Sequence, residues 1–139
     1  MTGDKDDEKL KGTKQNDYII GNKGSDKIKG GKGDDLLLGG PGDDVIKGGK
    51  GADIIAGGSG INKVKGDSGA DTFVLSKDDG YTKILDFNSA EDKIQITSGS
   101  KGIQFELAGG SIEIRQNGEL LGVVTNQTII EAVSDGIIF

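Results

Sequence analysis

A nine-residue unit repeats without interruption from Gly12 to Val74 and constrains the fold more than any other feature of the chain. Seven copies begin at residues 12, 21, 30, 39, 48, 57 and 66. The copy at residues 30–38 reads Gly-Gly-Lys-Gly-Asp-Asp-Leu-Leu-Leu. Glycine at unit positions 1, 2 and 4 permits positive φ angles. We therefore expect each unit to form a six-residue turn followed by a three-residue strand.

Position 8 of the unit is apolar in every copy. Its residues are Ile19, Ile28, Leu37, Ile46, Ile55, Val64 and Phe73. In a strand, the neighbouring positions 7 and 9 face the opposite way. We therefore expect position 8 to form an inner stripe between two sheets. Two units make one coil, so the odd-numbered units build one sheet (the odd sheet) and the even-numbered units build the other (the even sheet).

The outer faces of these two sheets are chemically opposite. Positions 7 and 9 of the odd sheet are Tyr18, Ile20, Leu36, Leu38, Ile54, Ala56, Thr72 and Val74. The same positions of the even sheet are Lys27, Lys29, Val45, Lys47, Lys63 and Lys65. Because a large apolar face rarely stays exposed, we expect residues 75–139, or failing these a partner, to cover the odd sheet.

Composition limits what else the chain can be. It has 26 glycines, four phenylalanines, two tyrosines and no tryptophan, so the apolar core alone would be thin, and bound metal would supply stability. The absence of cysteine and histidine excludes disulfides and Ser-His or Cys-His catalysis. A formal net charge of −6 disfavours nucleic-acid binding. The sequence also lacks a phosphate-binding fingerprint, so we expect that the chain is not an enzyme.

The first residues carry charge rather than an apolar stretch. Residues 1–11 are expected to be a solvated tail, with the alternative that they cover the open first coil. They lack the apolar region of a secretory signal peptide. This fits a cytosolic protein, a piece of a longer one, or export through a C-terminal signal. No run of about 18 apolar residues exists, so no transmembrane segment is expected.

Beyond Val74 the period breaks and short strands follow. They are expected at residues 82–87, 92–97, 103–107, 111–116 and 119–124. Asn117-Gly118 between the last two is the strongest hairpin signal in the chain. A helix is an open alternative at residues 127–133, although β-branched residues there weaken it.

The repeat resembles the Gly-Gly-x-Gly-x-Asp-x-apolar-x nonapeptide of RTX (repeats-in-toxin) proteins. The sequences at residues 69–74, 84–87 and 91–94 resemble the cap of RTX C-terminal modules, such as serralysin C-terminal domains and alginate epimerase R-modules. The resemblance implies an all-β fold: a parallel β-roll over residues 12–74, and a β-rich cap over residues 75–139 that covers one sheet. Residues 135–139 also resemble the tail of type I secretion substrates, with a final strand as the alternative.

Position 6 of every turn supplies a hard oxygen ligand. These residues are Asp17, Asp35, Asp53 and Asp71 on one edge and Asp26, Asp44 and Asn62 on the other. Carboxylate and carbonyl oxygens suit calcium better than magnesium or zinc. Four stacked turns leave three gaps and three leave two, so we expect about five Ca²⁺ ions. A purely turn-forming role for the acids is the alternative.

The resemblance also implies which backbone groups bind the ions: positions 2 and 4 of one turn and positions 1 and 3 of the next stacked turn. These residues are Thr13, Gln15, Asn22, Gly24, Gly30, Gly31, Lys32, Gly33, Gly39, Gly40, Pro41, Gly42, Gly48, Gly49, Lys50, Gly51, Gly57, Ser59, Gly66 and Ser68. The neutral Asn62 should weaken its site, and Thr13 and Gln15 should strain the first turn. Asp86 is a candidate for a further site beside Asp71.

These observations predict a secreted calcium-binding module that folds outside the cell. Filling five sites would change the formal charge from −6 to +4. The lysines of the even sheet then have two interpretations. They keep the sheet soluble, or they bind an anionic polysaccharide or cell surface.

Overall fold

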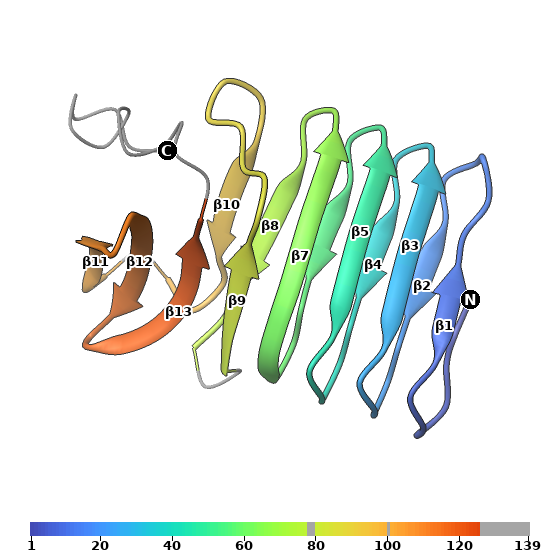
Figure 1. The fold of residues 1–139 in the computed structure, drawn as a ribbon, viewed down its shortest axis with the longest axis horizontal. Coiled ribbons are helices and arrows are strands. Elements are labelled where there is room, and N and C mark those ends of the chain that lie inside the picture. Colours follow the sequence, from blue (N-terminus) through green and yellow to red (C-terminus); the bar gives the residue numbers. More distant parts are fainter. Residues whose placement is uncertain (78–79, 100, 126–139) are drawn as a thin grey trace.

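The computed structural model describes residues 1–77, 80–99 and 101–125, and their regular structure is all strand (Figure 1). The eight-stranded sheet has the order β1 (Lys9–Lys11), β3 (Lys27–Lys32), β5 (Val45–Lys50), β7 (Gly60–Ser68), β9 (Gly80–Ile84), β13 (Glu119–Val124), β12 (Ser111–Gln116) and β11 (Ile103–Ala108). The five-stranded sheet has the order β10 (Lys93–Ile96), β8 (Thr72–Leu75), β6 (Ile54–Ala56), β4 (Leu36–Leu38) and β2 (Tyr18–Ile20). The described residues contain no helix long and apolar enough to cross a membrane.

The two sheets are the even and odd sheets that the repeat predicts. Within the repeats all strand pairs are parallel, and each residue pairs with the residue two units later, as Ile19 does with Leu37. The position 8 side chains are all buried between the sheets, from Ile19 at 0% exposed to Ile28 at 2%. The predicted parallel β-roll is therefore confirmed.

The first eleven residues form a coil of this roll. β1 pairs in parallel with β3, and Thr2 forms a bridge with Ile20. Residues 3–11 keep the nine-residue phase, with Gly3 at position 1, Glu8 at position 6 and half-buried Leu10 at position 8. The structure shows the alternative in which these residues cover the open end of the roll, and not a solvated tail, because the unpaired edge of β3 offers backbone hydrogen bonds that they take up.

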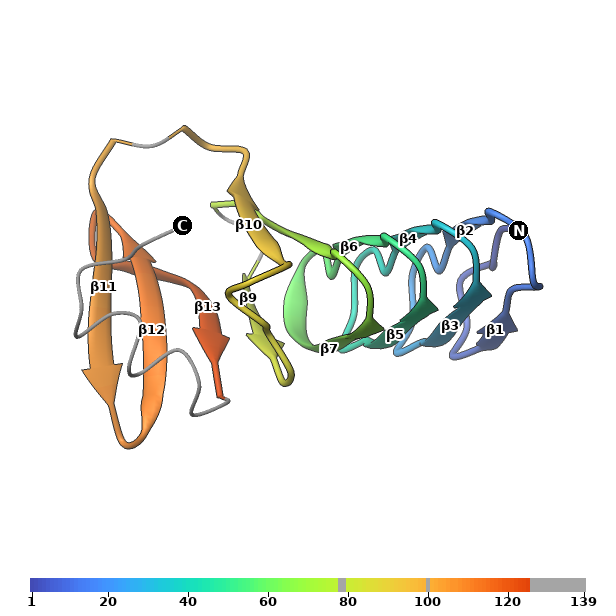
Figure 2. The same ribbon diagram turned by 90° about the horizontal axis from the view of Figure 1, so that it is seen from above.

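The described strands after Val74, up to residue 125, stack on the end of the roll instead of covering the odd sheet (Figure 2). β9 pairs with β7, β10 pairs with β8, and β13 continues the even sheet beside β9. On the outer face of the odd sheet, Tyr18 and Ile54 remain 51% and 44% exposed. The expectation of a covered face is therefore wrong for the described residues after Val74. The last coil has open strand edges, and pairing with them satisfies backbone groups that contact with a flat face would not.

The cap has a core of its own that joins the core of the roll. Phe87 packs against Phe73 with ring centroids 6.0 Å apart, and Ile112, Ile114 and Leu121 are buried. The predicted hairpin is confirmed: β12 and β13 are antiparallel, and Asn117 and Gly118 have φ angles of 52° and 88°. The helix considered at residues 127–133 and the secretion-like tail at 135–139 lie outside the described residues.

Candidate metal centre

The turns of successive coils stack at a spacing that leaves no room for side chains at the glycine positions. Gly31 and Gly49 have φ angles of 127° and 123°, which side-chain-bearing residues rarely adopt. A Cβ atom on Gly49 would also collide with the carbonyl oxygen of Gly31 in the turn below. The sequence therefore uses glycine so that carbonyl groups of adjacent turns can approach one another.

One oxygen of each position 6 carboxylate is used by the backbone. The amide of Asp35 donates to Oδ1 of Asp53 at 2.8 Å, and the amide of Asp53 donates to Oδ1 of Asp71 at 2.9 Å. On the other edge the amide of Asp26 donates to Oδ1 of Asp44 at 2.8 Å. The position 6 residues thus form two ladders, in which each turn is tied to the next through a side-chain oxygen, a carboxylate in every case but Asn62.

The second oxygen is buried and has no hydrogen-bond partner. This holds for Oδ2 of Asp26, Asp35, Asp44 and Asp53, whose residues are at most 2% exposed. A buried charge without a partner is costly. Each orphaned oxygen lies beside the first glycine of its own turn and the carbonyl oxygen of the first glycine in the next stacked turn, as Asp35 Oδ2 does beside Gly30 and Gly48 O. The gaps between turns are therefore lined with oxygen atoms that lack a counter-charge.

Burial changes the acidity of these carboxylates. Loss of hydration raises the pKa of Asp44 and of Asp53 to about 6, and that of Asp71 to about 7. Backbone hydrogen bonds oppose the shift, while the charge of the preceding acid of the ladder adds to it, as Asp35 does for Asp53. Without a cation, the ladder thus holds its negative charge at a free-energy cost.

The donor set fits a hard cation bound mainly by backbone. The described residues contain no group of three or more acidic side chains placed to hold an ion. A site in a gap would therefore combine a few carboxylate oxygens with carbonyl oxygens, which is the coordination that calcium accepts with six to eight ligands. Several carbonyls assigned by resemblance also join adjacent turns: Gly42 donates to Ser59 O at 3.0 Å and Gly51 donates to Ser68 O at 3.0 Å. A carbonyl has a second lone pair for a ligand role.

The repeats match a family of known proteins. A family model described as the RTX calcium-binding nonapeptide repeat (4 copies) matches residues 2–37, 29–64 and 47–80, which is more than half of the chain. The chain belongs to the RTX calcium-binding repeat family. The first match begins at residue 2, in agreement with the coil formed by residues 3–11.

One solved structure shows a similar fold. The chain is 22% identical to the AlgE6R3 subunit of the Azotobacter vinelandii mannuronan C5-epimerase, with a TM-score of 0.51, covering 99% of this chain and 80% of that one. It also resembles the extracellular lipase LipA from Serratia marcescens (16% identity, TM-score 0.40, 88% and 36% covered). The AlgE6R2 subunit of the same epimerase is 21% identical to the chain, with a TM-score of 0.37 and coverage of 86% of both chains. The search of curated proteins gave no match.

The first and sixth RTX repeats depart from this pattern. Oδ2 of Asp17 accepts hydrogen bonds from the Thr13 amide at 2.6 Å and the Thr13 hydroxyl at 2.9 Å, so this turn satisfies its own carboxylate. Asn62 accepts from the Asp44 amide at 2.9 Å, and its Nδ2 donates to Gly58 O at 2.9 Å. Both side chains thus have partners where other repeats leave an orphaned oxygen. Weaker ion binding at the sites that involve Asp17 or Asn62 stays a prediction.

Asp92, and not Asp86, continues the ladder into the cap. The amide of Asp71 donates to Oδ1 of Asp92 at 2.9 Å. Both oxygens of Asp86 instead accept from the amides of Gly66 and Asp67, at 3.0 and 2.9 Å, and so cap the last turn. Sequence reasoning missed Asp92, although this residue directly precedes a strand, β10, in the same way that each ladder acid does.

A second ladder, which sequence reasoning also missed, occupies position 5 of the turns. Asp34 Oδ1 accepts from the Ala52 amide at 2.8 Å, and Asn16 Oδ1 accepts from the Asp34 amide at 2.9 Å. These bonds run in the direction opposite to that of the position 6 ladder. Asp and Asn at position 5 therefore connect adjacent coils by hydrogen bonds, and the charge of Asp34 also raises the pKa of Asp53.

Proposed function

We propose that this chain is a calcium-stabilised RTX module in which ion binding and folding are coupled. The observation that carries the proposal is the row of buried carboxylate oxygens that have no partner and lie beside carbonyl oxygens of the next turn. A divalent cation in each gap would neutralise this charge. In the gap between the third and fifth repeats, the binding groups would be the carboxylates of Asp35 and Asp53 and the carbonyls of Gly31, Gly33, Gly48 and Lys50.

Ion binding would be coupled to folding because the ligands of each ion come from two different turns. The unfolded chain brings no two turns together, so the free energy of binding would contribute directly to folding. Extracellular calcium modules typically bind at about 10⁻⁴–10⁻³ M, well above the calcium level inside cells. We therefore propose a secreted module with about five ions that folds after export, by the type I route that residues 135–139 suggest.

Far-UV circular dichroism tests this function directly. We expect a gain of β signal on adding calcium to the chelated protein, and no such gain with magnesium at equal concentration. Calcium is distinguished from magnesium because the latter demands near-ideal octahedral geometry and dehydrates reluctantly. A full β spectrum in chelator, unchanged by calcium, would contradict the proposal, since the apolar core and cap would then suffice.

A second candidate function, binding of an anionic polysaccharide, is favoured by a groove on the even sheet. Two lysine rows run across the strands: Lys11, Lys29, Lys47 and Lys65 in one, and Lys14, Lys32 and Lys50 in the other. Between them lies a groove of about 480 Å³, where Gly31 and Gly49 carry no side chain. Asp67 also lines the groove, but within residues 1–77, 80–99 and 101–125 none of these lysines forms an ion pair with an acidic side chain.

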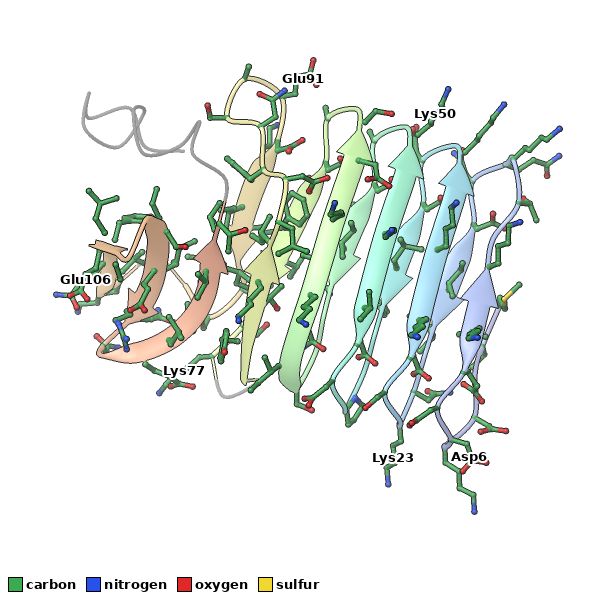
Figure 3. The ribbon with its side chains drawn as sticks, in the orientation of Figure 1. Asp6, Lys23, Lys50, Lys77, Glu91 and Glu106 are labelled. Atoms are coloured by element: carbon green, nitrogen blue, oxygen red, sulfur yellow. The ribbon has the colours of Figure 1, made fainter. Side chains whose placement is uncertain are left out.

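Unpaired like charges on adjacent strands are unfavourable, and a bound polyanion would remove this repulsion. A need for solubility alone explains the lysine rows less well, because on the opposite outer face, among the described residues, Tyr18 and Ile54 remain 51% and 44% exposed. The test is retention on immobilised alginate in calcium. Lys29→Gln with Lys47→Gln should lower the salt concentration needed for elution. Lys23→Gln is the control, since Lys23 projects at the opposite end of the strands from Lys50 (Figure 3). Equal elution of wild type and both variants would refute groove binding.

A further inference from the structure

The turn of the first coil reproduces the local geometry of the ladder turns although its sequence departs from the repeat. The amide of Glu8 donates to Oδ1 of Asp26 at 2.9 Å, as the amide of Asp26 donates to Oδ1 of Asp44 at 2.8 Å. β1 continues the parallel register of the even sheet, with Lys9 opposite Lys27. Glu8 thus stands below Asp26 on the same edge as the other ladder residues.

Glu8 also reproduces the orphaned oxygen. Its Oε1 accepts from the Asp4 amide at 2.9 Å, whereas its Oε2 is buried and has no hydrogen-bond partner. The two oxygens nearest to a Cβ position on Gly3 are Glu8 Oε2 and Gly21 O. At Gly21, one coil further on, the corresponding oxygens are Asp26 Oδ2 and Gly39 O. The same two kinds of oxygen therefore face each other in both gaps.

The carbonyl on the other side of the gap is also in place. The Asp6 carbonyl oxygen lies 2.5 Å from a Cβ position on Gly24, so it faces the turn of the next coil as the Gly24 carbonyl faces Gly42. The Gly3 carbonyl, by contrast, accepts from Asn22 Nδ2 at 2.7 Å and is engaged. Position 4 and position 6 of the first coil thus offer the same groups as in the later repeats.

We infer that a further calcium site lies between the turn at residues 3–8 and the turn at residues 21–26, with Glu8 as its carboxylate ligand from the first coil. The Glu8 Oε2 atom, the Gly21 carbonyl and the Asp6 carbonyl would contribute to it, together with Asp26. This site lies outside the seven repeats that the sequence displays. It rests on the proposed function, since it assumes that the other gaps take calcium. Its consequence is that the exposed first coil is held to the roll by an ion.

The test compares Glu8→Gln with Asp7→Asn by counting bound calcium in equilibrium dialysis. Each variant removes one negative charge from the same turn, but Asp7 is not among the proposed ligands. Its Oδ1 accepts from the Ser25 amide at 2.7 Å, and asparagine can keep that bond, as Asn16 does with the Asp34 amide. We expect Glu8→Gln to bind one ion fewer than wild type and Asp7→Asn to bind the wild-type number. An unchanged count in Glu8→Gln would overturn the inference. A wild-type protein that binds no calcium would overturn the proposed function instead.

A crystal of the wild-type protein grown in calcium provides a check that needs no variant. We expect an anomalous difference peak between Glu8 Oε2 and the Gly21 carbonyl, in line with the peaks of the later gaps. Peaks in the later gaps and none at Glu8 would overturn the inference while leaving the proposed function intact.

Discussion

The backbone amide of Asp35 donates a 2.8 Å hydrogen bond to Oδ1 of Asp53, while Oδ2 of Asp53 is buried without a partner. One carboxylate therefore has two different tasks. One oxygen ties adjacent coils of the folded roll together, and the other carries a charge that only a cation or a proton can neutralise. The stability of the roll should thus depend on calcium and on pH in ways that single substitutions can separate.

Replacing Asp53 with asparagine should have opposite effects with and without calcium. In chelator we expect Asp53→Asn to stabilise the protein by about 1–3 kcal/mol, because a buried charge is removed and an amide can donate as Asn62 does to Gly58 O. In calcium we expect lower stability and weaker binding than in wild type. The fraction of β signal in chelator, by far-UV circular dichroism, and urea unfolding in calcium measure these two effects. Glu91→Gln, in an exposed turn, is the control and should change neither measurement (Figure 3). The same sign of effect in both conditions would contradict the assignment.

The chelated protein should become more stable as the pH falls. The pKa values of Asp44, Asp53 and Asp71 are raised by burial to about 6, 6 and 7, from 3.8 in the unfolded chain. Between these values the folded state binds more protons than the unfolded state, so stability is lost as the pH rises from 3.8 to 7. With calcium bound the slope should reverse, because protons then compete with the ion. The fraction of β signal in chelator and the melting temperature in calcium, each followed across this pH range, would measure the two slopes, and slopes of the same sign would count against ion binding at these acids.

Core and surface positions of the same strand should respond very differently to truncation. Ile46 is fully buried between the sheets, whereas its neighbour Val45 is 37% exposed on the outer face. We expect Ile46→Ala to cost about 2–5 kcal/mol in calcium through the loss of apolar burial and the cavity left behind. Val45→Ala should cost less than about 1 kcal/mol. Chemical denaturation gives both values, and similar costs would mean that the inner stripe is misassigned.

Close stacking of the turns should make Gly49 intolerant of substitution. We expect Gly49→Ala to lower stability by more than about 2 kcal/mol, since alanine is strained at a φ of 123° and its Cβ would meet Gly31 O. Gly110 is the matched control: its φ is also positive, at 81°, but nothing lies within 4 Å of a Cβ there. Gly110→Ala should therefore cost only about 1 kcal/mol. Equal losses of melting temperature would show that backbone strain alone matters at both sites.

Much of the roll and of the candidate site could be read from local pattern. Backbone sterics set the turn and the strand within each nine-residue unit. The repetition of this unit then gives the inner stripe, the alternation of sheets and the position 6 ladder. The Asn117-Gly118 hairpin is equally local, since two residues with positive φ are enough to define it. The coil at residues 3–11 kept this phase too, but charged residues in place of glycine concealed it.

What the amino-acid sequence alone determined is therefore the periodic part: strands, turns and an inner stripe whose spacing is set by backbone geometry over nine residues. Only the tertiary structure decided where the segments outside the period attach. The first coil and the cap lie along the axis of the roll because open edges of β3, β7 and β8 offer unpaired backbone groups. Asp92 enters the ladder and Asp86 caps a turn because chain segments about 20 residues apart meet in a given register. Such pairing depends on which edges and amides remain unsatisfied in the folded molecule, and no local pattern encodes that.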